Sequence, residues 1–163
     1  MAGRSGDHSQ VIISNVMFPQ HANPSGNVHG GEIMKLMDST AGVAALKYAK
    51  TNVVTARVDE LEFFHPIHIG NVVTCYGKVI FVGNTSMEIA VTVTVEDIAK
   101  DEPPKTALTS RFTFVALDED GRPQRVPDFI PADDEERRMF EEGKQRYLAC
   151  KQRKAREISQ AKE

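Results

Sequence analysis

The sequence predicts an α+β domain in which an antiparallel sheet is wrapped around one long buried helix. The first observation is the helix itself, at roughly residues 32–48, where small and apolar residues leave only a narrow polar face with Lys35 and Lys47. A helix that is apolar nearly all round belongs in a core. The second observation is the order of the other elements, because one strand-like run precedes this helix and several follow it with short turns between them.

Five strand-like runs flank the helix, each rich in β-branched or alternating apolar residues and bounded by turn-forming residues. They cover residues 10–18, 52–64, 71–82, 86–95 and 106–117. Between residues 52 and 64 the apolar positions change phase around Asp59 and Glu60, which predicts a bulge or a twist. No long linker, repeat or low-complexity tract interrupts this order, so residues 10–131 are expected to form one domain.

The C-terminal segment has a different character from the sheet. Residues 122–131 contain three prolines and predict an extended coil. Residues 132–163 are expected to form a charged helix, which Asp133 can cap. The last part of this helix is basic, and a basic helix end is expected to be solvated because the helix dipole favours cations there. Its cationic residues are Lys151, Arg153, Lys154 and Arg156.

Composition and charge limit the class of protein to which the chain can belong. The 163 residues are 40% hydrophobic and 26% charged, with a net charge of −3, so the chain shows no bias toward nucleic acid or a membrane surface. Cys75 and Cys150 have no metal-ligand spacing and are interpreted as reduced thiols in a cytoplasmic protein. No apolar run approaches the roughly 18 residues of a membrane span. Residues 1–9 lack an apolar signal core and are expected to form a flexible tail.

Asp38 breaks the apolar pattern of the buried helix. Its neighbours at helical spacing include Met34, Ala41 and Gly42, and a carboxylate among such side chains is costly unless something pairs with it. The small neighbours also leave room for a ligand. Alternatively, Asp38 lies at the helix edge, where it reaches solvent or pairs with Lys35.

Gly30 and Gly31 stand just before the first turn of this helix. Unpaired N–H groups and the positive end of the dipole would polarise a carbonyl oxygen placed there, as in an oxyanion hole. Alternatively, the two glycines form a simple turn into the helix. Asp38 lies about two turns further on, roughly 10 Å by helix rise, which is too far for both groups to act on one carbonyl within one subunit. If both serve one site, two copies of the chain build it.

Asn23, the triplet His29-Gly30-Gly31 and Asp38 within an apolar helix together resemble the hotdog-fold acyl-CoA thioesterases. The most similar group is the acyl-CoA hydrolases that include brain acyl-CoA hydrolase and bacterial hexameric enzymes. The resemblance covers roughly residues 11–131 and continues through several downstream segments. These segments are residues 53–58, 63–67, 70–73, 82–86 and 112–118.

This resemblance implies a hotdog fold and the hydrolysis of fatty acyl-CoA to free acid and coenzyme A. Asp38 would act as general base on water or as a nucleophile that forms a mixed anhydride, and the sequence does not choose between them. Asn23 would orient water or the thioester carbonyl, and Thr55 would help to hold water or Asp38. Alternatively, Asn23 only starts a turn before Pro24, and Thr55 is only a β-branched strand former. The family also implies that Asn23 and Asp38 of one site come from different subunits of a dimer, and that three dimers form a homohexamer.

The resemblance also implies a set of contacts to coenzyme A, which carries phosphates that need cations and backbone amides. The candidates are His29, Arg57, Arg111 and the turn formed by Val82, Gly83, Asn84, Thr85 and Ser86. Alternatively, this turn is a plain hairpin. The basic end of the C-terminal helix could likewise contact coenzyme A phosphates instead of being merely solvated. No Walker or Rossmann glycine pattern is present, so coenzyme A is expected as substrate and product, with no cofactor and no metal.

Two other functions fit a hotdog chain. A dehydratase or hydratase acting on acyl thioesters needs a histidine in a loop of characteristic sequence before the helix, and this chain offers only His29 without such a loop. A non-catalytic module that binds or senses acyl-CoA would need neither Asn23 nor Asp38. The presence of both at the family's positions favours the thioesterase.

Overall fold

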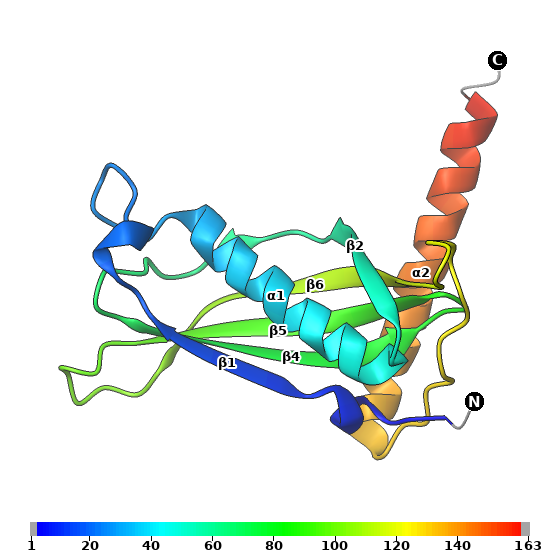
Figure 1. The fold of residues 1–163 in the computed structure, drawn as a ribbon, viewed down its shortest axis with the longest axis horizontal. Coiled ribbons are helices and arrows are strands. Elements are labelled where there is room, and N and C mark those ends of the chain that lie inside the picture. Colours follow the sequence, from blue (N-terminus) through cyan, green and yellow to red (C-terminus); the bar gives the residue numbers. More distant parts are fainter. Residues whose placement is uncertain (1–2, 161–163) are drawn as a thin grey trace.

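The computed structural model describes residues 3–160, which form one antiparallel sheet with a helix on each face (Figure 1). The elements, in chain order, are the 3-10 helix η1 (Gly6–Ser9), strand β1 (Val11–Val16), the 3-10 helix η2 (Pro19–His21), helix α1 (Gly30–Ala49), strands β2 (Asn52–Val58), β3 (Glu62–Phe63), β4 (Val72–Val82), β5 (Ser86–Glu96) and β6 (Lys105–Leu117), and helix α2 (Asp134–Gln160).

The sheet has the strand order β1-β4-β5-β6-β2, and β3 pairs with β6 beyond the end of β2. Every pair is antiparallel. The predicted α+β class and the sheet wrapped around one long helix are therefore confirmed, with strand ends shifted by a few residues. In this order β1 and β2 are the edge strands, and β2 has β6 as its one partner among the described residues.

The irregularity predicted around Asp59 is present, but it is a break in the strand. The chain leaves the sheet between Val58 and Glu62, and it returns as the short strand β3. A β-bulge lies earlier than predicted, at Ala56, where the register against β6 shifts between Thr55 and Arg57. A bulge turns the side chains on either side of it, so this one decides which residues of β2 face α1 and which face away.

Helix α1 is buried against one face of the sheet because its small residues allow close approach. Ala41, Ala44 and Ala45 are all fully buried, and a Cβ added at Gly77 of β4 would lie 3.0 Å from the Thr40 side chain. Large side chains from the central strands complete this core. The largest of them are Val73, Val79, Met87, Ile89, Val91, Val93, Leu108 and Phe112.

Helix α2 packs on the opposite face of the sheet. Its Gly143 would place a Cβ 2.4 Å from the Cβ of Phe81, so the two backbones meet at a position that admits no side chain. The rings of Phe140 and Tyr147 pack against Phe81 with centroids 5.1 and 5.5 Å away. Asp133 caps the helix as predicted, because its Oδ1 accepts a hydrogen bond of 2.7 Å from the amide of Glu136.

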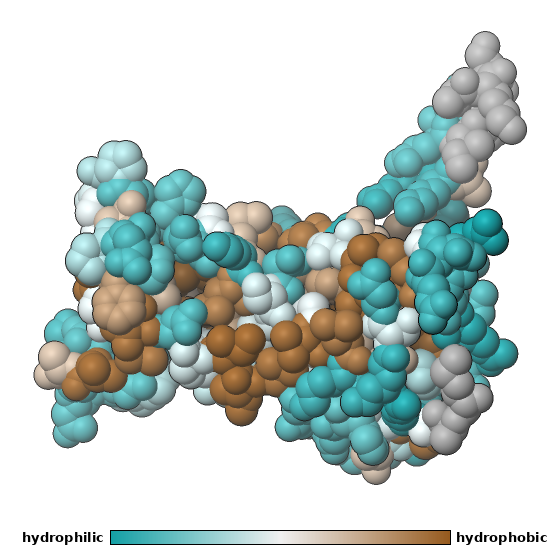
Figure 2. Space-filling view, in the orientation of Figure 1, coloured by the Kyte–Doolittle hydropathy of each residue, from teal (hydrophilic) through white to brown (hydrophobic). Residues whose placement is uncertain are grey.

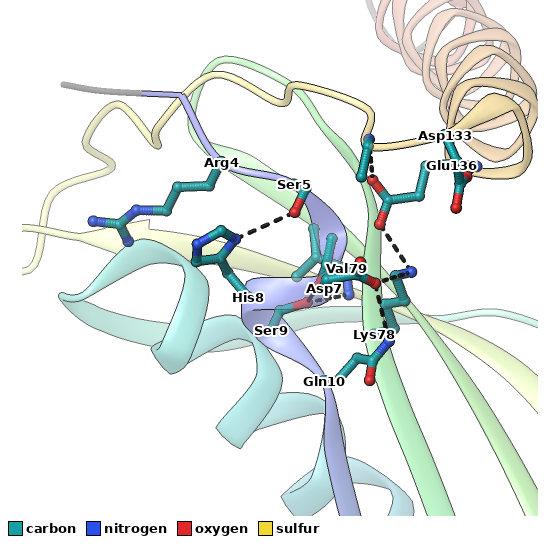
Figure 3. Close-up of polar contacts among 12 residues, drawn as sticks. Arg4, Ser5, Asp7, His8, Ser9, Gln10, Lys78, Val79, Asp133 and Glu136 are labelled. Carbon is teal, nitrogen blue, oxygen red and sulfur yellow. Dashed lines mark hydrogen bonds and ion pairs between the residues drawn. The ribbon is translucent and has the colours of Figure 1, made fainter.

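An ion cluster fixes the start of α2 to the sheet. Lys78 follows Gly77 along β4 and therefore points to the α2 face. Its Nζ lies 2.7 Å from Asp7 and 2.8 Å from Glu136, which is 2% exposed (Figure 3). Burial alone would lower the pKa of Lys78, but its bonds to these two carboxylates raise that pKa overall. The hydrogen bond from Lys78 and its positive charge hold the pKa of Asp7 below its usual range.

The flexible tail expected over residues 1–9 is wrong for residues 3–9. Ser9 is fully buried, and its hydroxyl accepts a hydrogen bond of 2.8 Å from the amide of Val79. The hydroxyl of Tyr48 donates to the carbonyl of Arg4 at 3.1 Å. These contacts pair polar groups that the sequence pattern alone does not connect. Residues 1 and 2 lie outside the described residues.

Within residues 3–160, neither α1 nor α2 is both long and apolar enough to cross a membrane.

Candidate functional site

The loop before α1 ends in a histidine that caps the helix. The Nδ1 atom of His29 accepts a hydrogen bond of 3.0 Å from the amide of Gly31, and its backbone carbonyl accepts one from Glu32. The helix begins at Gly30, two residues earlier than the sequence suggests. Within the described residues the amide of Gly30 donates no hydrogen bond, whereas that of Gly31 is occupied by its cap. The expectation that both amides are unpaired is therefore wrong for Gly31.

Asp38 is half-buried on α1 and has one specific partner. The hydroxyl of Thr55, on β2, donates a hydrogen bond of 2.7 Å to its Oδ1 atom. The structure thus brings together two of the predicted catalytic residues from different elements. The expected alternative of a pair with Lys35 is not formed within the described residues. Because Thr55 precedes the bulge at Ala56, its side chain stays on the α1 face.

Asn23 shapes the loop that leads to the helix. Its Oδ1 atom accepts hydrogen bonds from the backbone amides of Ser25 and Asn27, at 3.0 and 3.2 Å. The backbone amide of Asn23 donates to the carbonyl of Asn27. Both side-chain bonds come from backbone donors, so they fix which end of the carboxamide is the oxygen. The Nδ2 group has no partner among the described residues and remains a donor for a ligand.

Large apolar side chains are exposed on α1 and on β2, the two elements that carry Asp38 and Thr55. Three large side chains on α1, Met34, Val43 and Leu46, are 40–46% exposed. On the edge strand β2, Val54 is 43% exposed and points to the face opposite Thr55. Figure 2 shows hydrophobic residues gathered along the middle of the face on which α1 lies. An edge strand with exposed apolar side chains is a template for pairing with another chain.

Three residues outside the turn were predicted to contact coenzyme A, and one of them lines a groove beneath α2 whereas the other two do not. Arg57 and Arg111 both lie near Asp59, with N–O distances of 2.9 and 3.5 Å. Arg57 also donates to the thiol of Cys150 at 2.9 Å and lines a groove beneath α2, whereas Arg111 does not line it. His29 lies at the start of α1 and is not part of this groove.

The turn predicted to contact coenzyme A joins β4 to β5 and is closed by a hydrogen bond of 2.8 Å from Gly83 to Ser86. Thr85 and Ser86 line the groove, and Asn84 uses its carbonyl to hold the amide of Val126 at 3.1 Å. Val82 is buried in the core. The turn is therefore a real hairpin, and two of its five residues also face the groove.

The groove is also lined by residues of α2, including basic residues that were expected to be solvated. It has a volume of about 320 Å³, and α2 supplies four of its lining residues. These are Tyr147, Cys150, Lys151 and Lys154. The basic end of α2 was expected mainly to be solvated. Positions 147, 151 and 154 follow the spacing of a single helix face, which is the signal in the sequence that groups them.

Within the described residues, no group of three or more His, Cys, Asp or Glu side chains could hold a metal ion.

Residues 25–101 match the Thioesterase superfamily. A Bacillus subtilis protein named as an uncharacterized acyl-CoA thioester hydrolase is 34% identical over 146 residues, which are 90% of this chain and 84% of that protein. The chain belongs to the acyl-CoA thioester hydrolases. This acyl-CoA hydrolase family member is also 40% identical over 145 residues to the mouse cytosolic acyl coenzyme A thioester hydrolase. The match covers 88% of the chain but only 38% of the length of the mouse protein.

Solved structures show the same fold, which confirms the hotdog prediction. An acyl-CoA hydrolase from Staphylococcus aureus, in complex with butyryl coenzyme A, coenzyme A and coenzyme A disulfide, is 33% identical with a TM-score of 0.82, over 98% of this chain and 94% of that one. An apo-hexameric acyl-CoA thioesterase is 30% identical with a TM-score of 0.87, over 95% of this chain and 99% of that one.

The S. aureus enzyme has also been solved as three single alanine variants. They replace one asparagine, one aspartate and one threonine, and successive residues of this set are 15 and 17 positions apart.

Proposed function

We propose that this chain is an acyl-CoA thioesterase, which hydrolyses fatty acyl-CoA to a free acid and coenzyme A. The observation that carries the proposal is the Asp38 carboxylate, which the Thr55 hydroxyl holds at 2.7 Å beside an open strand edge. Asn23, Asp38 and Thr55 are separated by 15 and 17 positions, like the three residues replaced in the S. aureus enzyme. This equal spacing supports the same three residues as the catalytic set here.

The helix start supplies the electrophilic side of the reaction. The unpaired amide of Gly30 and the positive end of the α1 dipole would polarise the thioester carbonyl and stabilise its developing negative charge. Gly31 contributes by positioning, because its amide anchors the His29 cap. A ring carbon of Phe63 lies 3.6 Å from the Cβ position of Gly30, so an apolar wall borders this amide.

Asp38 supplies the nucleophilic side. The bond from Thr55 occupies Oδ1, and Oδ2, which has no hydrogen-bond partner among the described residues, would act on water or on the thioester carbon. As a general base, Asp38 takes a proton from water while the hydroxide adds to the carbonyl carbon. As a nucleophile, it forms a mixed anhydride that water then hydrolyses. In both routes the C–S bond breaks and the thiolate of coenzyme A leaves and takes up a proton.

Asn23 acts as a donor in this proposal. The turn holds its Oδ1 atom, so its Nδ2 group is free to donate to the carbonyl or to the attacking water. A bond made by a preorganised donor costs little further ordering when the transition state forms.

Two copies of the chain build each site in this proposal. Gly30 and Asp38 are eight residues apart on one helix, about 12 Å along its axis, so one carbonyl cannot meet both within one subunit. The free edge of β2 and the exposed apolar residues of α1 offer the surface on which a second copy would pair. The hexameric neighbour supports a trimer of such dimers. The relatives of this chain that are named as cytosolic enzymes support a cytoplasmic location for it.

Coenzyme A would be bound by Arg57 and the hairpin turn of residues 82–86, with Arg111 and His29 as outer contacts. The placement of Arg57, Thr85 and Ser86 around one groove supports this assignment. The reaction as proposed needs neither a metal ion nor a further cofactor.

The test is thiol release from a panel of acyl-CoAs, from acetyl to palmitoyl. Asp38→Asn keeps an oxygen that can accept from Thr55 but removes the base, so the rate should fall at least about a hundredfold, the usual scale of general acid–base catalysis. Asp120→Asn changes the same group in an exposed turn and should leave the rate unchanged. Binding of acyl-CoA without thiol release by the native protein would reject the enzyme and favour the binding module.

A further inference from the structure

The turn that holds Asn23, over residues 23–27, is docked onto the loop of residues 64–71 that joins β3 to β4. The amide of Val28 donates to the carbonyl of Ile67 at 2.9 Å, and Asn27 forms an isolated antiparallel bridge with His68. The side chains of Asn27 and His68 also meet, with Nδ1 of the histidine 2.9 Å from Oδ1 of the asparagine. Backbone and side-chain contacts therefore join two loops that are far apart in the sequence.

The hydrogen bond between these two side chains has a defined direction. A carboxamide oxygen only accepts, so Nδ1 of His68 carries the hydrogen and donates it to Asn27. The backbone of Asn27 in turn makes two contacts with Asn23. Its amide donates to Oδ1 of Asn23 at 3.2 Å, and its carbonyl accepts from the Asn23 amide at 2.7 Å. A contact chain thus runs from His68 through Asn27 to Asn23.

His68 is itself held by the start of β4. Its amide donates to the side-chain Oδ1 of Asn71 at 2.9 Å, and its carbonyl accepts from the Asn71 amide at 3.1 Å. Gly70 permits this tight turn, since its φ of 91° lies in the region that favours glycine. Asn71 is buried, and its carbonyl accepts a hydrogen bond of 2.9 Å from the amide of Met17, just after β1. The His68 end of the contact chain is therefore attached to the sheet.

The contacts within the Asn23 turn do not by themselves fix its orientation. The turn projects from the body of the molecule near the start of α1 (Figure 1), so it could tilt as a unit without breaking its internal hydrogen bonds. The direction of a donor decides how well it stabilises a transition state, and a misplacement of about 1 Å is enough to lower a rate. Docking onto the β3–β4 loop supplies this constraint, and the side-chain bond in it comes from His68.

We propose that His68 is a positioning residue for thioester hydrolysis. By donating to Asn27, it holds the Asn23 turn in the orientation from which Nδ2 of Asn23 donates to the thioester carbonyl or to the attacking water. The inference rests on the proposed thioesterase function, because it adds a supporting residue to that site. His68 acts through Asn23 and does not touch the substrate, so its loss should lower kcat and leave KM nearly unchanged.

The first test is steady-state thiol release by variants of His68. His68→Ala removes the donor and should lower kcat about two- to tenfold, the scale of one hydrogen bond between neutral groups. His68→Asn keeps an N–H donor at the position of Nδ1 and should recover most of kcat. The control His65→Ala removes an exposed histidine of the same loop whose ring makes no hydrogen bond among the described residues, and it should leave kcat unchanged. A native kcat in His68→Ala would overturn the proposal.

The second test asks whether His68 acts through Asn23. In an Asn23→Ala protein no carboxamide is left to position, so adding His68→Ala should lower kcat no further. If the losses of the two single variants multiply in the double variant instead, His68 acts by another route and the proposal is wrong.

Amide exchange measured by NMR tests the contact chain without any turnover. The Val28 amide bonds across the two loops, so His68→Ala should speed its exchange about two- to tenfold, whereas His68→Asn and His65→Ala should not. The Asn27 amide is the internal control, because its bond to Asn23 lies within the turn and should persist when the turn tilts. Unchanged exchange at Val28 in His68→Ala would show that His68 does not hold the turn.

The outcomes separate this inference from the proposed function. Thiol release by the native protein, together with a native kcat in His68→Ala, would remove the positioning role and leave the thioesterase standing. Faster exchange at Val28 in His68→Ala, in a protein that releases no thiol from any acyl-CoA, would keep the contact chain. It would overturn the proposed function and, with it, the part of His68 in catalysis.

Discussion

At Asp38 a single hydrogen bond decides how a carboxylate on a buried helix is presented. The Thr55 hydroxyl fixes one oxygen at 2.7 Å and so limits the rotation of the other. A threonine at this point of a strand is ordinary by propensity, because β-branched residues favour strands. The role proposed for Thr55 rests on its contact with Asp38 on α1.

Thr55→Val should test this positioning role, because valine keeps the shape and the strand propensity but cannot donate. Loss of a hydrogen bond to a charged group costs roughly 1.5–3 kcal/mol, so kcat should fall about ten- to a hundredfold with little change in KM. Thr55→Ser restores a donor and should recover most of kcat. The measurement is steady-state thiol release. A native kcat in the valine variant would show that Asp38 needs no such partner.

Residue-level prediction succeeded where the local sequence sets the chemistry and failed where a loop conformation does. The mid-helix position of Asp38 was readable from its apolar neighbours. The occupied amide of Gly31 was not, because it depends on the His29 side chain turning back onto the helix. The loop backbone at His29 is held by a 2.7 Å hydrogen bond from its amide to the carbonyl of His21, a contact that the sequence does not reveal.

Among the elements, α2 shows most clearly which structural features the sequence predicts and which it does not. Its charge pattern, cap and approximate ends were readable from residues 132–163. The face of the sheet on which it packs was not, because a narrow apolar stripe fits either face of a sheet. Packing against Phe81 and the ion pair between Lys78 and Glu136 make that choice. The groove lined by the basic end of α2 is a consequence of it.

Gly143→Ala should separate packing from helix propensity in α2. The added Cβ would lie 2.4 Å from Phe81, and overpacking of this kind costs about 1–3 kcal/mol. Alanine in a helix gains up to about 1 kcal/mol over glycine, so the free energy of unfolding should fall by less than the clash alone would give. Urea denaturation measures this free energy of unfolding. The control is Lys144→Ala, which changes the exposed neighbouring residue and should leave the free energy of unfolding nearly unchanged. A stabilised Gly143→Ala protein would mean that α2 does not pack here as described.

For the whole molecule, the strand order is consistent with the proposal that one chain alone leaves the site incomplete. β2 lies at an edge with its apolar side chains exposed, and Thr55 and Asp38 lie beside that edge. The segments that form strands were readable from the sequence, because each run is short and clearly bounded, although the run over residues 52–64 forms two strands, β2 and β3. The order of the strands within the sheet was not predicted. A site shared between two subunits was inferred from the helix spacing and the family resemblance, since single-chain periodicity carries no information about a partner subunit.

The most direct measurement is subunit complementation between Asn23→Ala and Asp38→Ala. Each variant alone carries a defect in every site. If one site takes Asn23 from one subunit and Asp38 from the other, a mixed dimer contains one fully native site and one doubly altered site. Equal co-expression makes about half of the dimers mixed, so about one quarter of all sites should be native.

Thiol release from the co-expressed protein should therefore approach about one quarter of the native rate, well above either variant alone and above a mixture of the two purified variants. That result would support a thioesterase site shared between two copies of the chain. A co-expressed protein no more active than the average of the single variants would contradict it, and would assign Asn23 and Asp38 of each site to the same subunit.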